Sequence, residues 1–570
     1  MNPPDPKPYS IDRRGLLAGA AGVLAAGGPA GALGPEATAA PADPTPEAPA
    51  APAPPETPAP PQEAAPPEAT AFGPVTVRPN DARYGALVRG NNFRFVGRPG
   101  EIRVLGSTEQ VVRAVSDAVR NGRRIAVRSG GHCFEDFTAD PAVRMLLDLS
   151  PMDAVGYDAG RGAFAVQPGA TLGHVYRTLA KGWGVTIPAG GCPEVGAGGH
   201  FVGGGYGPLS RRYGSVVDHL YGVEVVVVGR DGTARAVVAT REEGDPHRDL
   251  WWAHTGAGGG NFGVVTRYWL RSPDAVGRDP SHVLPPAPRD MLEYLVVWAW
   301  DDRMTAHVFT SLLRNFGRWH ERWSAPDSPY AGLYAIMLPR HRKAASFEMI
   351  VQIDADIPNS AAMVADFVTA IRGDTDVEPI VNQGLTMPWM HLTTWPGLGE
   401  PGDVFTRRYK LKAGYLRRSL TDTQLDTIHR YLTDDTGTEH GGMLLIGYGG
   451  RVGAVAPDAT AIAQRGAIMK AVYQTLWLSE DDDADNLAWV RAFYRDVYAD
   501  TGGVPVPGEV SDGTYINYPD SDLADPARNT SGVPWYTLYY GANYPRLQRV
   551  KAKWDPRDVF RHTLSIRPPS

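Results

Sequence analysis

The chain has 570 residues, of which 43% are hydrophobic and 9% aromatic, so it can bury the cores of two domains or of one large composite. Its formal net charge is −7 and it has no basic run, which argues against a nucleic-acid partner. The 14 histidines are scattered without the spacing of metal ligands, so no metal site is predicted.

Residues 1–34 have the form of a twin-arginine signal peptide. Arg13 and Arg14 precede a small-residue apolar run, the arrangement of a signal that exports folded proteins. Because the run is rich in Gly and Ala and is interrupted by Pro29, it predicts no stable membrane anchor. We therefore expect export by the twin-arginine machinery and a secreted protein. The alternative is a disordered tail that has two arginines by chance.

Residues 35–71 form a spacer between this segment and the folded part. The stretch is almost entirely Pro, Ala, Glu and Thr. Such a composition cannot bury a core, so we expect an extended, disordered chain here.

From residue 72 to residue 285, helix and strand patterns alternate. Apolar residues at helical spacing predict a helix from Thr108, which can cap it, to Asn121. Mixed elements of this kind, with glycine-rich turns between them, predict an α+β domain around a ligand. Runs of β-branched and apolar residues predict strands at 124–128, 145–149, 163–167 and 223–228.

Residues 286–505 differ in their pattern of aromatic-rich strands and amphipathic helices, which indicates a second domain. A sheet covered by helices, with tryptophan and tyrosine on one face, suits the binding of a substrate. Residues 506–570 return to turn-rich motifs and are expected to rejoin the first domain. In the second domain, aromatic-rich strands are predicted at 294–300 and 347–353, and amphipathic helices at 361–371 and 421–432.

Three glycine-rich segments are candidates for binding a cofactor. The first, residues 128–132 (Arg-Ser-Gly-Gly-His), follows a predicted strand, and its paired glycines let backbone N–H groups approach a ligand such as a pyrophosphate. The second, residues 188–207, is so rich in glycine that it predicts backbone packed on a flat ligand, and residues 258–266 have the same character. None of them has the nicotinamide or P-loop pattern.

The two cysteines, Cys133 and Cys192, leave two interpretations open at this point. In an exported protein, two cysteines by default form a disulfide. The alternative is that they stay unpaired.

Six ordered blocks include these segments and two tyrosine-rich motifs near the C-terminus. They are Arg-Ser-Gly-Gly-His132-Cys-Phe-Glu, Ile-Pro-Ala-Gly-Gly-Cys192-Pro, Gly-Gly-Gly-Tyr206-Gly-Pro-Leu-Ser-Arg-Arg, Gly-Gly-Asn261-Phe-Gly-Val-Val-Thr, Tyr515-Ile-Asn-Tyr518-Pro-Asp and Tyr539-Tyr-Gly-Ala-Asn543-Tyr-Pro-Arg-Leu. Together they resemble the FAD-linked oxidases of the vanillyl-alcohol oxidase and berberine-bridge-enzyme type, and most closely the actinobacterial sugar and antibiotic oxidases. The resemblance implies a two-part FAD-binding domain of the PCMH type, residues 72–285 and 506–570. It also implies an inserted substrate domain, residues 286–505, of antiparallel sheet covered by helices.

The resemblance further implies that FAD is the cofactor, with its 8α-methyl bonded to His132 and its C6 bonded to Cys192. Cys133 is then a spare thiol. The competing interpretations are a Cys133–Cys192 disulfide and a structural His132. Of the other residues implied to contact the cofactor, His200 is assigned a hydrogen-bonding role and not attachment. The rest of this set is Arg128, Ser129, Gly130, Gly131, Gly198, Gly199, Gly260, Asn261, Gly263, Val265, Asn543 and Tyr544.

Alcohol oxidation needs a base for the hydroxyl proton while the carbinol hydride passes to the flavin. By resemblance the base is Tyr518, and Tyr206 lines the site; the alternative for both is core packing. An ordinary tyrosine has a pKa of about 10, so this base needs nearby cations or hydrogen-bond donors. Tyr415, Lys412 and Tyr448 are further candidates for the substrate pocket, with a surface role as the alternative for the first two.

One position departs from the pattern of a family member that oxidises its sugar twice. That protein has a second catalytic tyrosine two residues before a Tyr-Gly-Gly sequence, where this chain has Ile446, which cannot accept a proton. We therefore predict a single two-electron oxidation of a sugar or glycosylated metabolite, with O₂ as acceptor and H₂O₂ as product, although Tyr448 could substitute from the adjacent position. The alternatives are a flavin dehydrogenase, an oxidative cyclase of a secondary metabolite, and an inactive sugar-binding protein.

Overall fold

The computed structural model describes residues 72–393 and 407–569. The predicted signal peptide and spacer, residues 1–71, lie outside the described residues. Within the described part, no helix is long and apolar enough to cross a membrane.

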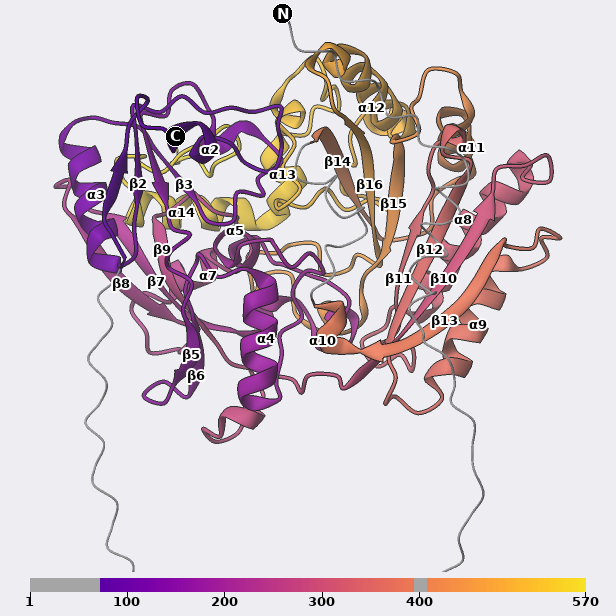
Figure 1. Cartoon of the computed structure of the whole chain (residues 1–570), viewed down its shortest axis with the longest axis horizontal. Helices are drawn as coiled ribbons and strands as arrows, with labels where there is room; N and C mark the ends of the chain where they lie inside the picture. The colour runs from indigo at the N-terminus through magenta and orange to yellow at the C-terminus, as the bar shows by residue number, and fades with distance from the viewer. Residues whose placement is uncertain (1–71, 394–406, 570) are drawn as a thin grey trace, which may run out of the picture. The chain divides into compact units, whose positions relative to one another are not determined.

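The first sheet has four strands in the order β1-β2-β4-β3 (Figure 1). Strands β2 and β3 both run parallel to β4, and β1 is antiparallel to β2. The parallel arrangement requires a crossover, which α3 (Thr108–Arg120) supplies between β2 and β3. The strands are β1 (Val75–Val77), β2 (Glu101–Val104), β3 (Ile125–Arg128) and β4 (Met145–Asp148), and the short helix α2 is Tyr84–Leu87.

The second sheet has five antiparallel strands in the order β5-β6-β9-β7-β8. Its strand β7 is a nearly continuous valine run because both of its faces are buried. Val225 and Val227 lie in the large core of the molecule, whereas Val226 and Val228 pack with α3 in a separate core between the two sheets. The strands are β5 (Val155–Asp158), β6 (Ala163–Val166), β7 (Leu220–Val228), β8 (Ala234–Thr240) and β9 (Val264–Leu270). The helices around this sheet are α4 (Leu172–Trp183), α5 (Ala197–Val202), α6 (Ser210–Tyr213) and α7 (Arg248–Ala253).

The third sheet has seven antiparallel strands in the order β13-β10-β12-β11-β15-β16-β14. Figure 1 shows helices α8, α9 and α11 on the side of this sheet that is turned away from the first two sheets, and α12 packs on β14 and β16. On β12, Phe347, Met349 and Val351 point to these helices, and Ile350 between them packs on the opposite face. The strands are β10 (Asp290–Ala299), β11 (Tyr334–Leu338), β12 (Ser346–Asp354), β13 (Val381–Pro388), β14 (Arg408–Leu416), β15 (Gly442–Gly447) and β16 (Met469–Trp477). The covering helices are α8 (Ala306–Trp323), α9 (Ser360–Arg372), α11 (Asp422–Thr433) and α12 (Asp483–Val497), and α10 (Trp389–Leu392) follows β13.

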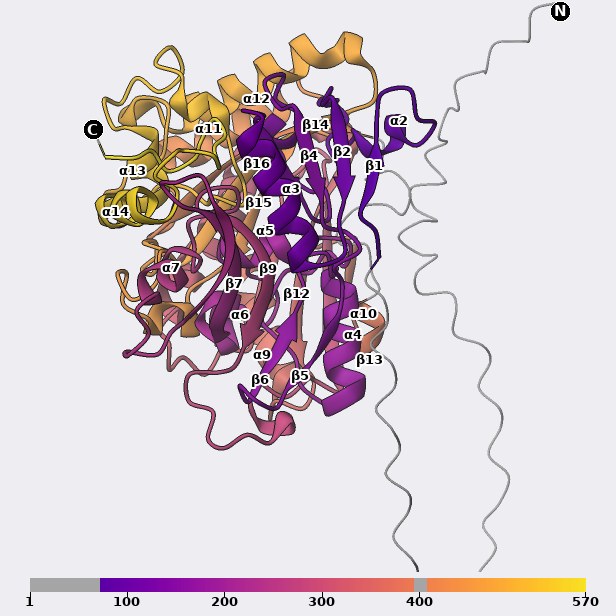
Figure 2. The ribbon, with the colours of Figure 1, turned by 90° about the vertical axis from the view of Figure 1, so that its left-hand side faces the viewer.

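The C-terminal segment returns to the first two sheets, as the sequence predicted. Helix α14 (Tyr544–Trp554) packs against α7, and α13 (Trp535–Tyr540) packs against α14 (Figure 1, Figure 2). The buried ammonium of Lys551 fixes this return, since it donates to the backbone oxygens of Asn261 and Phe560 and pairs with Asp555 at 2.6 Å.

Most predicted elements agree with the structure to within a few residues. The strand predicted at 223–228 begins earlier, at Leu220, and that predicted at 294–300 begins at Asp290. The capping prediction for α3 was wrong by one residue, because Ser107 adopts the extended N-cap conformation and accepts from the Gln110 N–H.

Candidate active site

Two glycine turns that are distant in sequence pack backbone against backbone. A Cβ atom on Gly130 would lie 2.5 Å from the nitrogen of Gly196, and one on Gly196 would lie 2.2 Å from Oγ of Ser129. Only glycine allows so close an approach. The contact brings together the loop of His132, which follows β3, and the loop of Cys192, which precedes α5.

His132 and Cys192 are both half-buried on these adjoining loops. Burial lowers the pKa of His132 to about 4, so its imidazole is neutral and nucleophilic at pH 7. Burial raises the pKa of Cys192, and the backbone N–H groups of Glu194 and Val195 oppose that rise. The Cys192 sulfur therefore has two donors that would stabilise a thiolate.

Cys133 forms no disulfide with Cys192, which removes that interpretation of the two cysteines. Burial raises the pKa of the Cys133 thiol to about 12, so it is an inert group beside the His132 loop. This placement agrees with its predicted role as the spare thiol.

His200 has the hydrogen-bonding role that was expected. Its Nε2 accepts the backbone N–H of Gly190 at 3.0 Å, which places its proton on Nδ1. Next to it, a Cβ on Gly199 would meet nothing within 4 Å, so this exposed glycine borders open space. Gly198 packs instead against Ser129 and Pro168, where a Cβ would lie 2.9 Å and 3.0 Å from their atoms.

Several residues predicted to contact the cofactor use their side chains to bind protein. The Arg128 guanidinium pairs with Asp148 and donates to the carbonyl of Arg89 at 3.1 Å. Asn261 donates to the carbonyl of Ala257 and accepts the N–H of Ile566. Both side chains therefore hold protein partners in this structure, and their roles at a cofactor stay predictions.

Four further predicted residues also have protein partners. Asn543 donates to the carbonyls of the 457–461 loop. Tyr544 stacks on Tyr536 with the ring centroids 4.1 Å apart. Gly263 packs against the carbonyl of Val226, to which a Cβ would be 2.5 Å, and Val265 lies half-buried on β9. Their roles at a cofactor stay predictions.

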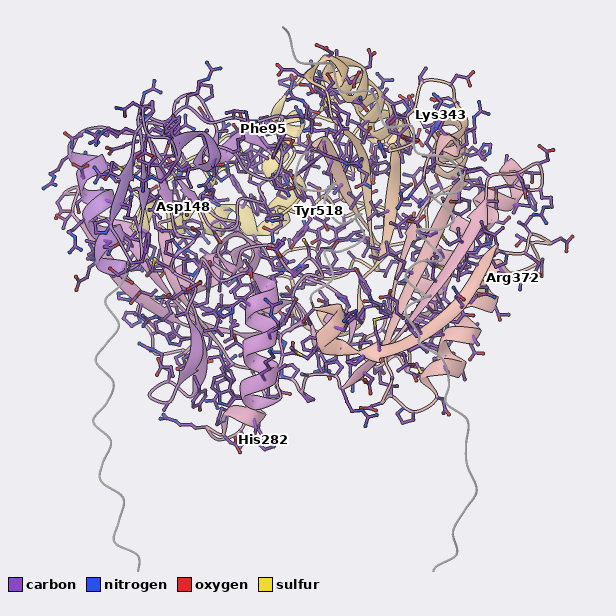
Figure 3. The ribbon with its side chains drawn as sticks, in the orientation of Figure 1. Phe95, Asp148, His282, Lys343, Arg372 and Tyr518 are labelled. Carbon is purple, nitrogen blue, oxygen red and sulfur yellow. The ribbon has the colours of Figure 1, made fainter. Side chains whose placement is uncertain are left out.

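The structure pairs the two predicted catalytic tyrosines. Tyr206 and Tyr518, 312 residues apart in sequence, lie with their hydroxyl oxygens 2.8 Å apart. Burial raises the pKa of both, and the shared hydrogen bond then lowers the pKa of Tyr518 and raises that of Tyr206. In the neutral pair either hydroxyl can donate; because the shared bond favours ionisation of Tyr518, Tyr518 is the phenol that loses its proton first, and Tyr206 then donates to the phenolate. Figure 3 shows Tyr518 between the strands of the first two sheets and β14 to β16.

A buried lysine that sequence reasoning missed lies under this pair. Lys470 Nζ is 3.2 Å from the ring centroid of Tyr206, 3.7 Å from that of Tyr515, 4.4 Å from that of Tyr448 and 4.8 Å from that of Tyr415. Burial lowers its pKa, and its nitrogen has no hydrogen-bond partner among the described residues. The faces of the four rings supply the negative potential that favours the ammonium form.

The other pocket candidates separate into two groups. Tyr415 and Tyr448 join the Lys470 cluster, so the surface alternative for Tyr415 was wrong. Lys412 lies apart from this cluster, because on β14 it alternates with Ala413 to the face that packs on α12. There its ammonium pairs with Asp522 at 3.0 Å, so it does not join the tyrosines as predicted.

Ile446 lies on the same sheet face as Lys470. The two are directly opposite each other in the β15–β16 register, and Ile336 is opposite Ile446 on the other side. All three positions belong to the face that holds the tyrosines, and no proton acceptor stands at position 446.

A signal for Lys470 was present in the sequence. A lysine in the otherwise apolar run Ala-Ile-Met-Lys-Ala-Val is rarely buried without a role. Tyr334 of β11 is a second missed residue, since it packs in the same cluster as Tyr206 and burial raises its pKa.

Taken together, the residues present fit a flat redox cofactor. A neutral imidazole and a cysteine with two backbone donors lie on adjoining glycine turns, and Phe134, two residues after His132, stacks on Tyr518 of the hydrogen-bonded pair of phenols. Such a site can remove a proton from a bound hydroxyl group next to an electron acceptor.

Comparison with known proteins gives two family matches. An FAD binding domain family matches residues 100–237, and the "berberine and berberine like" family matches residues 514–567. The aclacinomycin-N/aclacinomycin-A oxidase of Streptomyces galilaeus is 53% identical over 490 residues, 86% of this chain and 89% of that protein. The hexose oxidase of Chondrus crispus is 33% identical over 85% of this chain and 93% of that protein. The crystal structure of a glycopeptide hexose oxidase with teicoplanin has a TM-score of 0.84 and 51% identity, and the match covers 87% of this chain and 99% of that one.

Proposed function

Because the chain belongs to the berberine-bridge-enzyme-like family of FAD-linked oxidoreductases, we propose that it oxidises an alcohol carbon of a sugar or glycosylated metabolite. We further propose that O₂ accepts the electrons and H₂O₂ is released. The observation that carries this proposal is the hydrogen bond between Tyr206 and Tyr518, with Lys470 against the ring of Tyr206. Such a pair of phenols can accept the proton of a substrate hydroxyl group. The aclacinomycin and hexose oxidases among its relatives support the substrate class.

We propose that FAD is held through bonds to both His132 and Cys192. The neutral imidazole of His132 and the thiol of Cys192, with its two backbone donors, are nucleophiles on adjoining turns. When bound, FAD supplies the acceptor for the hydride of the carbinol carbon. Mass spectrometry of flavin-bearing peptides tests the attachment, and a flavin that leaves the protein on acid precipitation would contradict it.

In the proposed reaction, Tyr518 accepts the proton of the substrate hydroxyl group. Tyr206 donates a hydrogen bond to the Tyr518 oxygen and so stabilises the phenolate. Lys470 lies 3.2 Å from the ring centroid of Tyr206, and in its ammonium form it adds positive charge beside the pair. General-base catalysis of this kind contributes about 10² to 10⁴ in rate.

We propose one oxidation per substrate molecule. A second one would need another proton acceptor, and Ile446 occupies the place where a relative has a tyrosine. Tyr448 is nearby, but burial raises its pKa to about 12, which makes it a poor base at neutral pH.

The experiment is to purify the yellow protein and supply it in air with D-glucose, disaccharides, aclacinomycin N and teicoplanin while peroxide and O₂ are followed. The proposal predicts peroxide with at least one of them and a product lacking one pair of hydrogens. Flavin bleaching without peroxide would favour the dehydrogenase. Failure of every sugar to bleach the flavin would contradict the proposed substrate class.

We also propose export through the twin-arginine route before secretion. The basis is the Arg13-Arg14 segment and the spacer after it, since this route carries folded proteins and suits a cofactor that is loaded beforehand. The Arg13→Lys/Arg14→Lys variant is expected to stay inside the producing cell. Secretion of that variant at the wild-type level would contradict the route.

A further inference from the structure

A buried cluster of three cations and three carboxylates lies behind β14, on the face away from the tyrosines. The side chain of Lys410 is 2% exposed and contacts Glu135 and Asp520, the latter at 2.7 Å. Lys412 pairs with Asp520 and with Asp522. The sixth member, Arg491 of α12, holds Asp522 by two hydrogen bonds of 2.9 Å and 2.8 Å.

The carboxylates that Lys410 joins come from the two loops that carry the chemistry. Glu135 is three residues after His132, and Asp520 is two residues after Tyr518. Phe134, on the His132 loop, connects the two loops directly, because its ring stacks on that of Tyr518 with centroids 5.6 Å apart and an interplanar angle of 17°. A shift of either loop would therefore change the distance from the phenol to the flavin attachment site.

Lys412 makes a natural comparison with Lys410. Both lysines come from the same face of β14 and both bind Asp520, but only Lys410 reaches Glu135. Lys410 thus spans the two loops, whereas Lys412 reaches only one of them, that of Tyr518, and otherwise lies over the Tyr494 ring of α12.

The three positive charges of the cluster balance its three carboxylates. Although burial lowers the pKa of Lys410, Asp520 and Glu135 raise it more, so the ammonium form is retained. Without this cation, two carboxylates would remain buried with too little positive charge between them, and like charges in a poorly hydrated place move apart.

We propose that Lys410 is a positioning residue that fixes the Tyr518 loop against the flavin attachment loop. It does not touch the reacting atoms. By binding Glu135 and Asp520 together, it holds the phenol at a constant place relative to His132. This inference rests on the proposed function, because it assigns Lys410 its effect through the base and the cofactor named there.

The test compares Lys410→Met with its matched control Lys412→Met in the full-length holoenzyme. The readouts are acid-stable flavin content, unfolding temperature, and the rate of anaerobic flavin bleaching against substrate concentration, with the panel substrate that wild type oxidises fastest. Lys410→Met is expected to bleach about 10²-fold more slowly, the cost of a displacement of roughly 1 Å, with apparent substrate affinity changed less than about threefold. Its acid-stable flavin content should also fall, and both changes should be several-fold smaller in Lys412→Met.

The double variant Glu135→Gln/Lys410→Met separates positioning from stability. Removing the unpaired carboxylate should restore the unfolding temperature, while the bleaching rate stays low because the cation that joins the two loops is still missing and only the Ser521 hydrogen bond to position 135 and the Phe134–Tyr518 stack remain. Recovery of the rate together with the unfolding temperature would overturn the inference, and so would equal losses in the two single variants. If wild type itself binds no flavin or bleaches with no substrate, the proposed function has failed, which is a separate result.

Discussion

Replacing Tyr206 with phenylalanine removes the hydroxyl that donates to Tyr518 and keeps the ring over Lys470. A hydrogen bond to an ionised group contributes about 1.5 to 3 kcal/mol. Since one pKa unit corresponds to about 1.4 kcal/mol, loss of this bond should raise the pKa of Tyr518 by about 1 to 2 units. The phenolate fraction, and with it the rate below that pKa, falls tenfold for each unit.

The assay is the pH profile of kcat/KM. Because Tyr518 acts as a base and burial already raises its pKa, activity should rise with pH along an acidic limb. In Tyr206→Phe that limb should move upward by about 1 to 2 units, with a loss of about 10- to 100-fold at fixed pH on the limb. The matched control is Tyr473→Phe, which removes a buried hydroxyl of β16 that donates to Tyr498 at 3.4 Å. A limb that stays in place or moves to lower pH in Tyr206→Phe would refute the reasoning.

Three further predictions concern stability as well as activity. Lys470→Met removes a buried cation whose desolvation costs several kcal/mol, so the Tm should rise. The value of kcat/KM should fall about tenfold or more because the charge beside the tyrosine pair is lost. A lower Tm with unchanged kcat/KM would contradict this prediction. Gly130→Ala should lower the free energy of unfolding by about 2 kcal/mol or more, because the new Cβ would lie 2.5 Å from a backbone nitrogen. The control is Gly182→Ala, at an open helical position, where the free energy of unfolding measured in urea should rise by about 0.5 to 1 kcal/mol. Equal changes in the free energy of unfolding of the two variants would contradict the packing argument. Burial lowers the pKa of His254 to about 4 and that of His320 to about 3, so the folded state binds fewer protons than the unfolded chain below pH 6.5. Their contribution to the free energy of unfolding is complete above about pH 6.5 and is lost as the pH falls toward 4, by up to about 1.4 kcal/mol per pH unit for each histidine. The urea midpoint should therefore decrease when the pH is lowered from 7 to 5. A midpoint that stays constant over this range would contradict the prediction.

The α+β architecture could be predicted from the sequence because local patterns specify most of its elements. The valine run of β7 and the amphipathic pattern of α3 each indicate one type of element. The order of the strands in the sheets could not be predicted in this way. It depends on contacts such as β3 with β4 and β11 with β15, which no local pattern encodes and which only the family resemblance implied.

The candidate site was predicted where motifs carry it and missed where tertiary contacts build it. His132, Cys192 and Tyr518 stand in recognisable blocks, whereas Lys470 becomes significant only because four distant tyrosines surround it. Lys412 was grouped with Tyr415 as a pocket candidate, but it lies on the face of β14 that packs on α12, because the sequence does not reveal which alternating side chains of a strand face the site.

The central claim is that Tyr518 is the base of a flavin-dependent alcohol oxidation. Its most direct test is anaerobic mixing of substrate with wild-type protein and with Tyr518→Phe, followed by the visible absorbance of the flavin. The two proteins should have the same spectrum before mixing, because the substitution removes only a hydroxyl group. Wild type should then bleach, and Tyr518→Phe should bleach about 10² to 10⁴ times more slowly. Bleaching of Tyr518→Phe at the wild-type rate would contradict the claim.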